Sequence, residues 1–392
     1  MDNYTMIPLA DNVDEMFIGP FGSSLKNDCF VEKENGYCMV YEQKHAIQKT
    51  MDVETRYVSE EKYNELKRFN VRGGDIIVSC RGTIGETFVV PDDAPLGIMH
   101  PSIMKIRLKE DVYDKSYFNL LLREHLKKHD TTANGSGVKM AISAKELGSE
   151  LFPVPPMDEQ RKISKTISEI SEIIAARQQQ LQKLDELVKA RFVELLGDGN
   201  HPHIALIDLI IEGAGLSYGI VQPGDDGTGD IGVLRPVDMV DGKISTASIK
   251  RIDRSIGDGF KKTELYGDEL LITVRGTTGI TALTDIRFNG MNVTRGIAVV
   301  RYDRNKINPV YLNAYLNTDE SQRYIQEHTR GATLQQINLS DLRVQQIMVP
   351  PLALQEQMAA FVEQTDKSKA VIQKALDEAQ LLFDSLMQKY FG

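Results

Sequence analysis

Cysteines and long hydrophobic runs are scarce in this sequence. Its three cysteines, Cys29, Cys38 and Cys80, form no Cys-x-x-Cys pair, so we expect buried free thiols rather than disulfides or a metal site. No stretch approaches the roughly 20 apolar residues of a membrane-spanning helix, and the N-terminus is acidic, unlike a secretory signal. With 392 residues, 41% of them hydrophobic, the chain is predicted to be cytoplasmic and to form two or three globular domains.

The sequence also lacks an excess of basic residues. Its 46 Lys and Arg residues face 56 Asp and Glu residues, which gives a net charge of −10. A free-standing DNA-binding protein usually presents a basic surface, so composition alone argues weakly against nucleic acid. A locally basic face is still compatible with this charge, particularly where partner subunits supply further phosphate contacts.

Signatures of catalysis are missing as well. The sequence contains no phosphate-binding GxxxxGK[ST] loop and no Gly-rich strand-turn-helix that would hold a cofactor. Residues 308–311 (NPVY) approach the NPPY motif with which amino-methyltransferases hold an exocyclic amine. Residues 114–117 (DKSY), which occupy the same place in an internal repeat, lack the motif, and Asn or Asp there is typical of a helix N-cap. We therefore predict no catalytic site, no bound cofactor and no metal in this chain.

What the sequence does contain is two copies of one unit. Residues 74–85 (GDIIVSCRGTIG) recur as residues 267–279 (GDELLITVRGTTG), with one residue inserted between Asp268 and Arg275. Further matches at a constant offset of 195 are VPP at 154–156 and 349–351, Gln160 and Gln355, and Gly197 and Gly392. Solenoid repeats are much shorter, so the repeated unit is a whole domain with a helix.

The first part of each copy has a mixed pattern. Short β-branched runs such as residues 75–79 and 296–300 alternate with Gly-rich turns and a few helical segments. This pattern predicts an irregular α+β domain in each half of the chain.

A long helix is predicted after each double proline. Pro155-Pro156 can open a helix but cannot lie inside one, and Asp158 and Glu159 suit its N-terminal dipole. Apolar residues then recur every three, four or seven positions, which is a heptad seam. The seam positions are Ile163, Ile167, Ile170, Ile174, Leu181, Leu184, Val188, Phe192 and Leu195, and in the second copy Met358, Val362, Thr365, Ile372, Leu376, Ala379, Phe383, Met387 and Tyr390.

The two seams are expected to cover each other. A helix of about 40 residues spans ~60 Å, which is more than its own domain can cover. Since a whole domain separates the two helices in the sequence, they should pair antiparallel, with one domain at each end of a rod and a pseudo-two-fold relation between the copies.

Two Arg-Gly-Thr loops are the strongest candidates for contacts with DNA. Arg81 and Arg275 each lie between a β-run and a glycine turn, where a rigid base leaves the guanidinium free for a phosphate or a guanine edge. The alternative is an internal salt bridge, from Arg81 to Asp75 and from Arg275 to Asp268, that pins each turn.

Polar loops supply further candidates in both copies. Residues 19–26, 131–139, 218–224 and 329–338 are rich in Gly, Ser, Thr, Asn and Gln, the donors and acceptors that read base edges from loops on a rigid frame. The candidate DNA-binding residues are Ser23, Ser24, Lys26, Arg81, Thr83, Ser136, Lys139, Tyr218, Gln222, Arg275, Thr277, Thr278, Thr333, Gln335 and Asn338.

Taken together, these features resemble the specificity subunits of Type I restriction-modification systems. The resemblance rests on GPFGSSLK at 19–26, SYGIVQPG at 217–224, the paired RGT loops and the two helices that each follow VPP, and it covers essentially the whole chain. One departure is that Pro20-Phe21-Gly22 stands in the first copy where the second has Tyr218-Gly219-Ile220.

The resemblance implies a domain organisation and partners. Residues 1–155 and 201–350 would be target-recognition domains, each reading one half of a bipartite, asymmetric double-stranded DNA target. Residues 156–200 and 351–392 would form the antiparallel spacer, which sets the gap and docks two methyltransferase subunits. Those partners would carry S-adenosylmethionine and the adenine chemistry, and a motor-nuclease subunit can join them.

Two other classes of protein stay open at this point. One is a coiled-coil scaffold that holds protein partners without reading DNA. The other is a self-contained modification enzyme, which the missing cofactor motifs disfavour.

Overall fold

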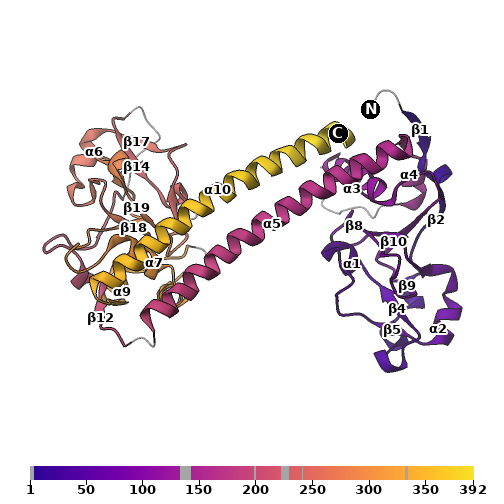
Figure 1. The fold of residues 1–392 in the computed structure, drawn as a ribbon, viewed down its shortest axis with the longest axis horizontal. Coiled ribbons are helices and arrows are strands. Elements are labelled where there is room, and N and C mark those ends of the chain that lie inside the picture. Colours follow the sequence, from indigo (N-terminus) through magenta and orange to yellow (C-terminus); the bar gives the residue numbers. More distant parts are fainter. Residues whose placement is uncertain (1–3, 133–142, 198–199, 222–228, 241, 332–333) are drawn as a thin grey trace. The chain divides into compact units, whose positions relative to one another are not determined.

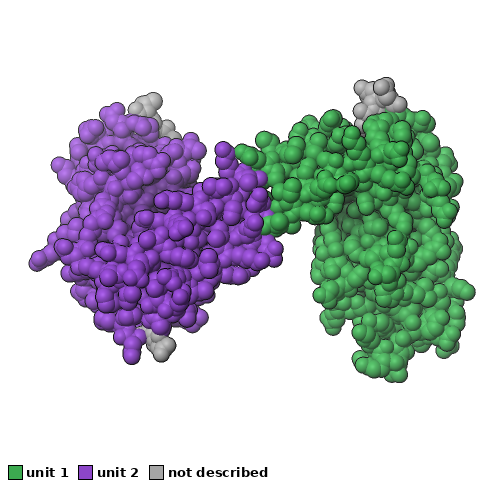
Figure 2. Space-filling model, viewed as in Figure 1, with its two compact units in different colours: residues 1–176, 376–392 green, residues 177–375 purple. Residues whose placement is uncertain are grey.

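The chain forms two compact units. The computed structural model describes residues 4–132, 143–197, 200–221, 229–240, 242–331 and 334–392. Unit 1 contains residues 1–176 and 376–392, and unit 2 contains residues 177–375 (Figure 2). Helices α5 (Met157–Leu196) and α10 (Leu352–Phe391) each contribute one part to either unit.

Both long helices begin directly after a double proline, as predicted. The acidic residues Asp158 and Glu159 occupy the first turn of α5, where they favour the positive end of the helix dipole. The helix ends before Gly197, whose φ of 55° is the left-handed conformation common after a helix. The last residue of the chain, Gly392, likewise follows α10.

The seam of each helix packs against the other helix within both units. In unit 1, Ile163 and Ile167 of α5 share a core with Met387 and Phe391 of α10. In unit 2, Phe192 and Leu196 at the end of α5 share a core with Met358 and Val362 at the start of α10. Within each unit the start of one helix therefore meets the end of the other, so the helices pair antiparallel (Figure 1). All predicted seam positions are buried or half-buried.

The described residues of unit 1 form two larger sheets and a two-stranded sheet, β1-β11. A four-stranded antiparallel sheet has the order β2-β10-β7-β8, and a five-stranded sheet has the order β3-β5-β4-β9-β6, with β4 and β9 parallel. The strands are β1 (Thr5–Pro8), β2 (Val13–Ile18), β3 (Phe30–Val31), β4 (Cys38–Tyr41), β5 (Tyr57–Val58), β6 (Asn70–Val71), β7 (Ile76–Ser79), β8 (Thr87–Val89), β9 (Gly97–Met99), β10 (Ile103–Leu108) and β11 (Leu151–Val154), and the helices are α1 (Gln43–Gln48), α2 (Glu60–Glu65), α3 (Lys115–Thr132) and α4 (Ala144–Ser149).

Strand β7 shows how the sequence pattern places this core. All four of its residues are buried, as expected for a short continuous apolar run in a central strand. Successive side chains of a strand point to opposite faces. Accordingly Ile76 and Val78 pack with Phe118 of α3, whereas Ile77 packs with Tyr41 of the second sheet.

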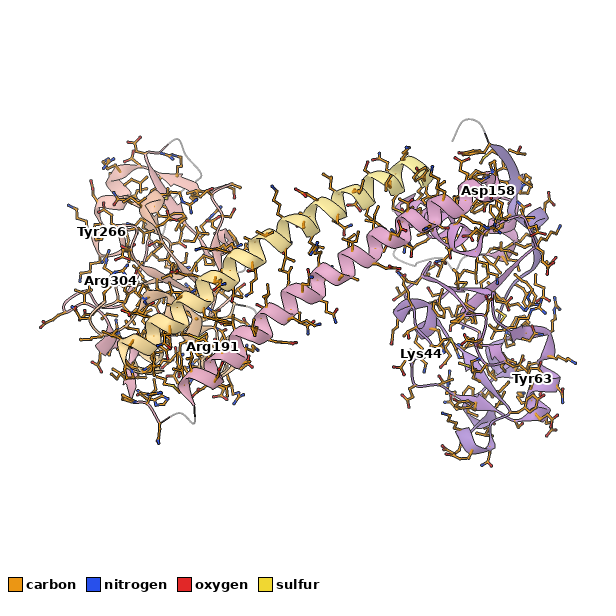
Figure 3. All side chains as sticks on the ribbon, in the orientation of Figure 1. Lys44, Tyr63, Asp158, Arg191, Tyr266 and Arg304 are labelled. Carbon is orange, nitrogen blue, oxygen red and sulfur yellow. The ribbon has the colours of Figure 1, made fainter. Side chains whose placement is uncertain are left out.

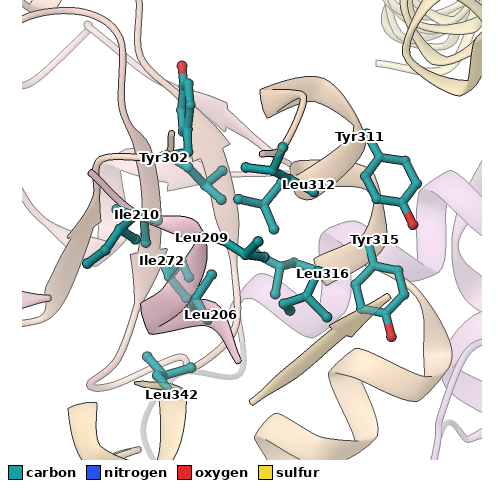
Figure 4. Close-up of a cluster of buried hydrophobic side chains, with 14 of the residues drawn as sticks. Leu206, Leu209, Ile210, Ile272, Tyr302, Tyr311, Leu312, Tyr315, Leu316 and Leu342 are labelled. Carbon is teal, nitrogen blue, oxygen red and sulfur yellow. The ribbon is translucent and has the colours of Figure 1, made fainter. Parts of the chain in front are cut away.

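Unit 2 repeats this architecture. Its four-stranded sheet has the order β13-β21-β18-β19, and in the sheet β17-β14-β20 strands β14 and β20 are parallel, as β4 and β9 are. The strands are β12 (His203–Ala205), β13 (Ser217–Tyr218), β14 (Ile231–Leu234), β15 (Met239–Val240), β16 (Lys243–Ile244), β17 (Lys250–Ile252), β18 (Leu270–Thr273), β19 (Thr281–Leu283), β20 (Asn292–Val293), β21 (Ile297–Val300) and β22 (Gln346–Met348), and the helices are α6 (Arg254–Asp258), α7 (Pro309–Leu316), α8 (Asp319–His328) and α9 (Leu339–Val344). Figure 4 shows its larger core, in which Ile272 of β18 packs with Leu312 and Leu316 of α7.

The strand register corrects the predicted alignment of the two copies. Asp75 and Glu269 each precede a four-residue strand, β7 and β18, and each is 1% exposed. Asp75 accepts a hydrogen bond from Arg72 N (3.0 Å), and Glu269 accepts one from Tyr266 N (2.7 Å), three residues upstream in both cases. Asp75 therefore corresponds to Glu269, and the predicted match of Asp75 with Asp268, with its one-residue insertion, is wrong. That match followed the Gly-Asp dipeptide that both copies contain, and the strands are in a register one residue away from it.

A buried glutamine fixes the start of each long helix. Gln160 Oε1 accepts from Asp114 N (2.9 Å), and its Nε2 donates to Pro155 O (2.8 Å). Gln355 makes the equivalent bonds with Asn308 N (2.8 Å) and Pro350 O (2.8 Å). Asp114 and Asn308 in turn cap the helices that follow them, as predicted, so each clamp joins its long helix to its own globular domain.

The cysteines are free thiols, as predicted. Burial raises the pKa of Cys38 to about 11 and that of Cys80 to about 12, so neither is a reactive thiolate at neutral pH. Cys29 is only half-buried, so the expectation of burial is wrong for this residue. Within the described part of the chain, no helix has both the length and the apolar character that crossing a membrane requires.

Candidate nucleic-acid interface

The two Arg-Gly-Thr loops are equivalent turns between paired strands. The first joins β7 to β8 and the second joins β18 to β19. Gly85 N donates to Ser79 O (2.9 Å), and Gly279 N donates to Thr273 O (2.8 Å). Gly82 and Gly276, with φ of 67° and 86°, adopt the left-handed conformation that favours glycine. Each unit therefore holds its arginine on a turn of the same conformation.

A neighbouring turn holds each of these loops to a second predicted loop. Cys80 N donates to Ser102 O (2.8 Å), and Gly19 N, where the loop 19–26 begins, donates to Ile103 O (2.9 Å). A side-chain carbon on Gly19 would lie 2.2 Å from His100 O, so only glycine fits there. In unit 2, Val274 N donates to Gly296 O and Ile220 N donates to Val293 O, both at 2.8 Å. Each unit thus brings the two predicted segments together.

The salt bridges considered as an alternative are not formed. Asp75 accepts two hydrogen bonds from Arg107, and Asp268 pairs with Arg304, which is labelled in Figure 3. Arg81 is exposed, and neither it nor Arg275 forms an ion pair with any residue that the structure describes. The Nε of Arg275 is buried without a hydrogen-bond partner. Both guanidinium groups are therefore unneutralised.

In unit 2 the loop 329–338 lies against the Arg275 turn. Gly276 N donates to Gln335 O (2.9 Å), and Ile337 N donates to Val274 O (3.0 Å). The hydroxyl oxygens of Thr278 and Thr329 are 3.0 Å apart. The candidates Thr277, Thr278 and Gln335 therefore gather beside Arg275.

Tyr218 and Asn338 border the same region. The Tyr218 hydroxyl accepts a hydrogen bond from Leu339 N (3.3 Å). Tyr218 and Asn338, with Arg343, line a hollow of about 500 Å³. Arg343 donates to Leu216 O (2.9 Å), so its guanidinium is partly engaged by the protein itself.

The candidates of unit 1 are less closely gathered in the described residues. Ser23 and Lys26 are exposed and Ser24 is half-buried, while Leu25 between them is 5% exposed and anchors the loop. Thr83 is exposed on the Arg81 turn. Four candidates, Ser136, Lys139, Gln222 and Thr333, lie outside the described residues. For all fifteen candidates, contact with DNA stays a prediction.

One basic residue beside the site was missed. Arg295 lies on the turn before β21, whose Gly296 accepts from Val274 of the Arg275 loop. It is exposed and has no ion pair within the described ranges. Arg295-Gly296 directly precedes a β-branched run, just as Arg81-Gly82 follows one. This Arg-Gly pattern at the end of a strand could have identified Arg295 from the sequence.

The acidic residue that shares a hollow with Arg81 is engaged by two other basic residues. Glu42 lines a hollow of about 350 Å³ together with Arg81, and it accepts from Lys44 Nζ (3.0 Å) and from Arg56. Burial opposes ionisation of Glu42, but the bonds from Arg56 and Lys44 bring its pKa below the usual value. Among the described residues, no three His, Cys, Asp or Glu side chains are placed to hold a metal ion. The chemistry present suits an anionic or hydrogen-bonding ligand.

Comparison with known proteins identifies the family. The model of the Type I restriction modification DNA specificity domain matches residues 17–186 and 229–380. The EcoBI specificity subunit of a Type I restriction enzyme from Escherichia coli is 23% identical over 349 residues, which are 81% of this chain and 73% of that protein.

Solved structures share the fold over nearly the whole chain. The S subunit of a Type I restriction-modification system from M. genitalium matches with a TM-score of 0.61 at 14% identity, over 100% of this chain and 96% of that one. A chain from a study of complex assembly and conformational transition in the type I R-M system matches with a TM-score of 0.55 at 16% identity, over 99% and 97%.

The family match covers most of both repeated copies. Specificity subunits are the non-catalytic components of these systems and give the complex its DNA target. This chain belongs to the Type I restriction-modification DNA specificity family, and its role is that of the specificity subunit.

Proposed function

We propose that this chain reads a bipartite DNA target, one half with residues 1–155 and the other with residues 201–350. The observation that carries the proposal is a free guanidinium on the same turn of the same sheet in each unit, Arg81 and Arg275. Guanidinium groups are the commonest readers of guanine edges and also bind phosphate. Because the side chains around the two turns differ, the two half-sites differ and the target is asymmetric.

The helical segments 156–200 and 351–392 form the spacer that docks two methyltransferase subunits. Both long helices carry exposed apolar side chains, Ile173 and Leu187 on α5 and Val371 and Leu381 on α10, which suit burial against partners. The partners supply S-adenosylmethionine and the adenine chemistry, and a motor-nuclease subunit joins them for cleavage. Because chromosomal DNA is the ligand, the complex works in the cytoplasm.

The test uses the chain together with its methyltransferase subunits, and maps methylated adenines in a genome that the complex modifies. Arg81→Ala and Arg275→Ala should each relax one half-site only, by about 1–3 kcal/mol of discrimination if a base contact is lost. Each variant is the matched control of the other. If a variant binds and methylates every DNA sequence less well by the same factor, the arginine contacts a phosphate instead of a base. Retardation of DNA without any sequence dependence would favour a scaffold.

The isolated chain should neither methylate nor cleave DNA and, with its charge of −10, should bind DNA weakly. Equilibrium binding of labelled S-adenosylmethionine to the isolated chain checks this assignment of the chemistry. Measurable binding would contradict it.

A further inference from the structure

Gln43 in unit 1 has a buried polar atom that forms no hydrogen bond within the described residues. Gln43 is the first residue of α1 and follows the fully buried strand β4. Its Oε1 is buried and accepts no hydrogen bond from any described residue. Buried polar atoms are nearly always paired in folded proteins, so an unpaired one requires an explanation.

Gln43 lies beside the Arg81 turn. It lines the hollow of about 350 Å³ that is also lined by Arg81, His100 and Ser102. A side-chain carbon on Gly82 would lie 3.9 Å from Gln43 Nε2. Gln43 is half-buried and no hydrogen bond within the described residues holds its amide, so the amide can turn into the hollow without breaking a hydrogen bond.

The other groups of the hollow leave no negative charge free. Glu42 is engaged by Arg56 and Lys44. His100 Nδ1 accepts from Ser102 N (3.2 Å), so the neutral ring carries its proton on Nε2. Burial lowers the pKa of His100, which keeps the ring neutral at pH 7. A ligand in this hollow therefore meets the Arg81 guanidinium, the Lys44 ammonium that shares Glu42 with Arg56, the Gln43 amide, the Ser102 hydroxyl and the His100 imidazole.

The orphaned atom of Gln43 indicates which part of DNA it meets. Phosphate oxygens only accept hydrogen bonds, so they cannot satisfy Oε1. The edge of adenine offers the N6 amino group as donor and N7 as acceptor, which a glutamine amide matches with two bonds. Guanine presents two acceptors to an arginine in the same groove. Gln43 thus suits a base edge, and Arg81 beside it can contact a neighbouring guanine.

Unit 2 differs at this position. Strand β4 pairs parallel with β9 as β14 pairs with β20, and the registers place Tyr41 opposite Met99 and Leu234 opposite Val293. Gln43 therefore corresponds to Pro236, two residues after Leu234. The Pro236 ring packs against Gly296, where an added side-chain carbon would lie 2.5 Å from it. The same place beside the Arg275 turn offers no hydrogen-bonding side chain.

We propose that Gln43 is a specificity-determining residue, whose amide pairs with the major-groove edge of an adenine beside the base that Arg81 contacts. The inference rests on the proposed function, since it assigns one contact within the half-site that unit 1 reads. It also assigns part of the difference between the two half-sites to one position, glutamine in unit 1 and proline in unit 2.

The experiment uses the full chain with its methyltransferase subunits and maps methylated adenines for each variant. Gln43→Ala should remove the preference at one base pair, by on the order of tenfold or more, in the half-site that Arg81→Ala relaxes. Gln43→Glu, which can only accept, should shift that preference from adenine towards cytosine. Gln48→Ala, an exposed glutamine at the other end of α1, is the matched control and should leave the motif unchanged.

Thermal unfolding distinguishes a contact between Gln43 and a DNA base from a contribution of Gln43 to the stability of the fold. Gln43→Ala should leave the midpoint unchanged, because the side chain makes no described hydrogen bond that could be lost. An unchanged motif, equal weakening on all duplexes, or a change in the half-site that Arg275→Ala relaxes would each overturn the assignment of Gln43. Failure of the proposed function looks different: the unaltered complex would yield no bipartite motif at all.

Discussion

Units 1 and 2 bury a carboxylate at the same place and satisfy it differently. In unit 1, Asp75 accepts from Arg107 Nε (2.7 Å) and Nη2 (2.8 Å), which is a bidentate ion pair. In unit 2, Glu269 accepts from Tyr266 N and Gly267 N, and the nearest nitrogen of Arg301 is 3.8 Å away. Glu269 accepts three backbone hydrogen bonds from its own turn, whereas Asp75 accepts one from Arg72 N. Arg301 therefore stays at ion-pair distance from Glu269 without donating a hydrogen bond to it.

Arg301, which occupies the position of Arg107 in unit 1, donates its hydrogen bonds to backbone carbonyls. Arg301 donates to Lys262 O (2.8 Å) and Glu264 O (2.6 Å), which joins two segments of unit 2. The order of the four-stranded sheet, the glycine turns and the glutamine clamps are the same in both units, whereas the polar contacts around them differ. The common frame therefore specifies the fold, and the side chains that differ are free to specify different half-sites.

The largest expected effect comes from removing the second copy, residues 201–392. A fragment of residues 1–200 lacks Met387 and Phe391, which cover Ile163 and Ile167. In the repeat, Phe192 and Leu196 stand where Met387 and Phe391 stand in the second copy, so a second fragment can supply the missing apolar surface. We expect an antiparallel homodimer that, with methyltransferase partners, modifies a palindromic target.

Sedimentation of the fragment checks the dimer, and adenine mapping checks the target. Phe192→Ser in the fragment is the matched control and should give a monomer. A folded monomer of the unaltered fragment at tens of micromolar would contradict the pairing. So would a dimer that modifies only the original asymmetric target.

The next effect tests the two buried carboxylates. Asp75→Asn removes the partner of a buried charge and should cost about 3–5 kcal/mol, lessened by Glu15, which also pairs with Arg107 (2.8 Å). Glu269→Gln should cost only about 1–2 kcal/mol, because Arg301 keeps its backbone partners. Hydrogen exchange of the amides in β7 and β18 measures each unit separately. Equal costs would show that the two arrangements are energetically the same.

The glutamine clamps should give equal effects, smaller than that of Asp75→Asn. Gln160→Leu and Gln355→Leu keep the side-chain size but remove the same hydrogen bonds, so each should cost about 1–3 kcal/mol. Gln179→Leu on the exposed surface of α5 is the control and should be nearly neutral. Urea denaturation followed by circular dichroism checks all three. A large difference between the two clamp variants would mean that only one of them joins helix to domain.

Local patterns allowed much of the fold to be predicted from sequence. The seam of α5 from Ile163 to Leu195 follows the helix period, and the prolines at 155–156 mark its start, so both could be read from neighbouring residues. The strand β7 was evident as a short β-branched run. The register of the repeat was not, because the letters Gly-Asp at 267–268 match those at 74–75 while the buried carboxylate is Glu269.

The site depended on contacts between distant residues. Whether Arg81 is free depends on Arg107 taking Asp75, 32 residues away, and no local pattern shows this. The meeting of the Arg275 turn with the loop 329–338 is a tertiary contact of the same kind. Gln43 gave no signal in the sequence, since a single glutamine after a strand becomes informative only when its partners are known.

The smallest expected effect concerns a surface ion pair that only unit 2 has. Asp268 accepts from Arg304 Nη2 (2.5 Å) and from Tyr302, whereas unit 1 has Gly74 at the equivalent position. The Arg304 guanidinium, and less strongly the Tyr302 hydroxyl, hold the pKa of Asp268 below its ordinary 3.8, although burial opposes them. This stabilisation is complete above pH 3.8 and is lost as the pH falls through the lower pKa of the folded state.

Asp268→Asn should therefore lower the stability of unit 2 at neutral pH by about 0–1 kcal/mol, because the pair is more than half exposed. The difference from the unaltered chain should shrink as the pH falls below 3.8. Hydrogen exchange of the β18 amides at neutral pH and below pH 3.8 measures this difference in stability. The β7 amides in the same samples are an internal control, whose exchange the substitution should not change. A difference that persists in acid would mean that Asp268 acts through shape or neutral hydrogen bonds rather than through its charge, and the acid sensitivity of unit 2 would then have to come from another carboxylate.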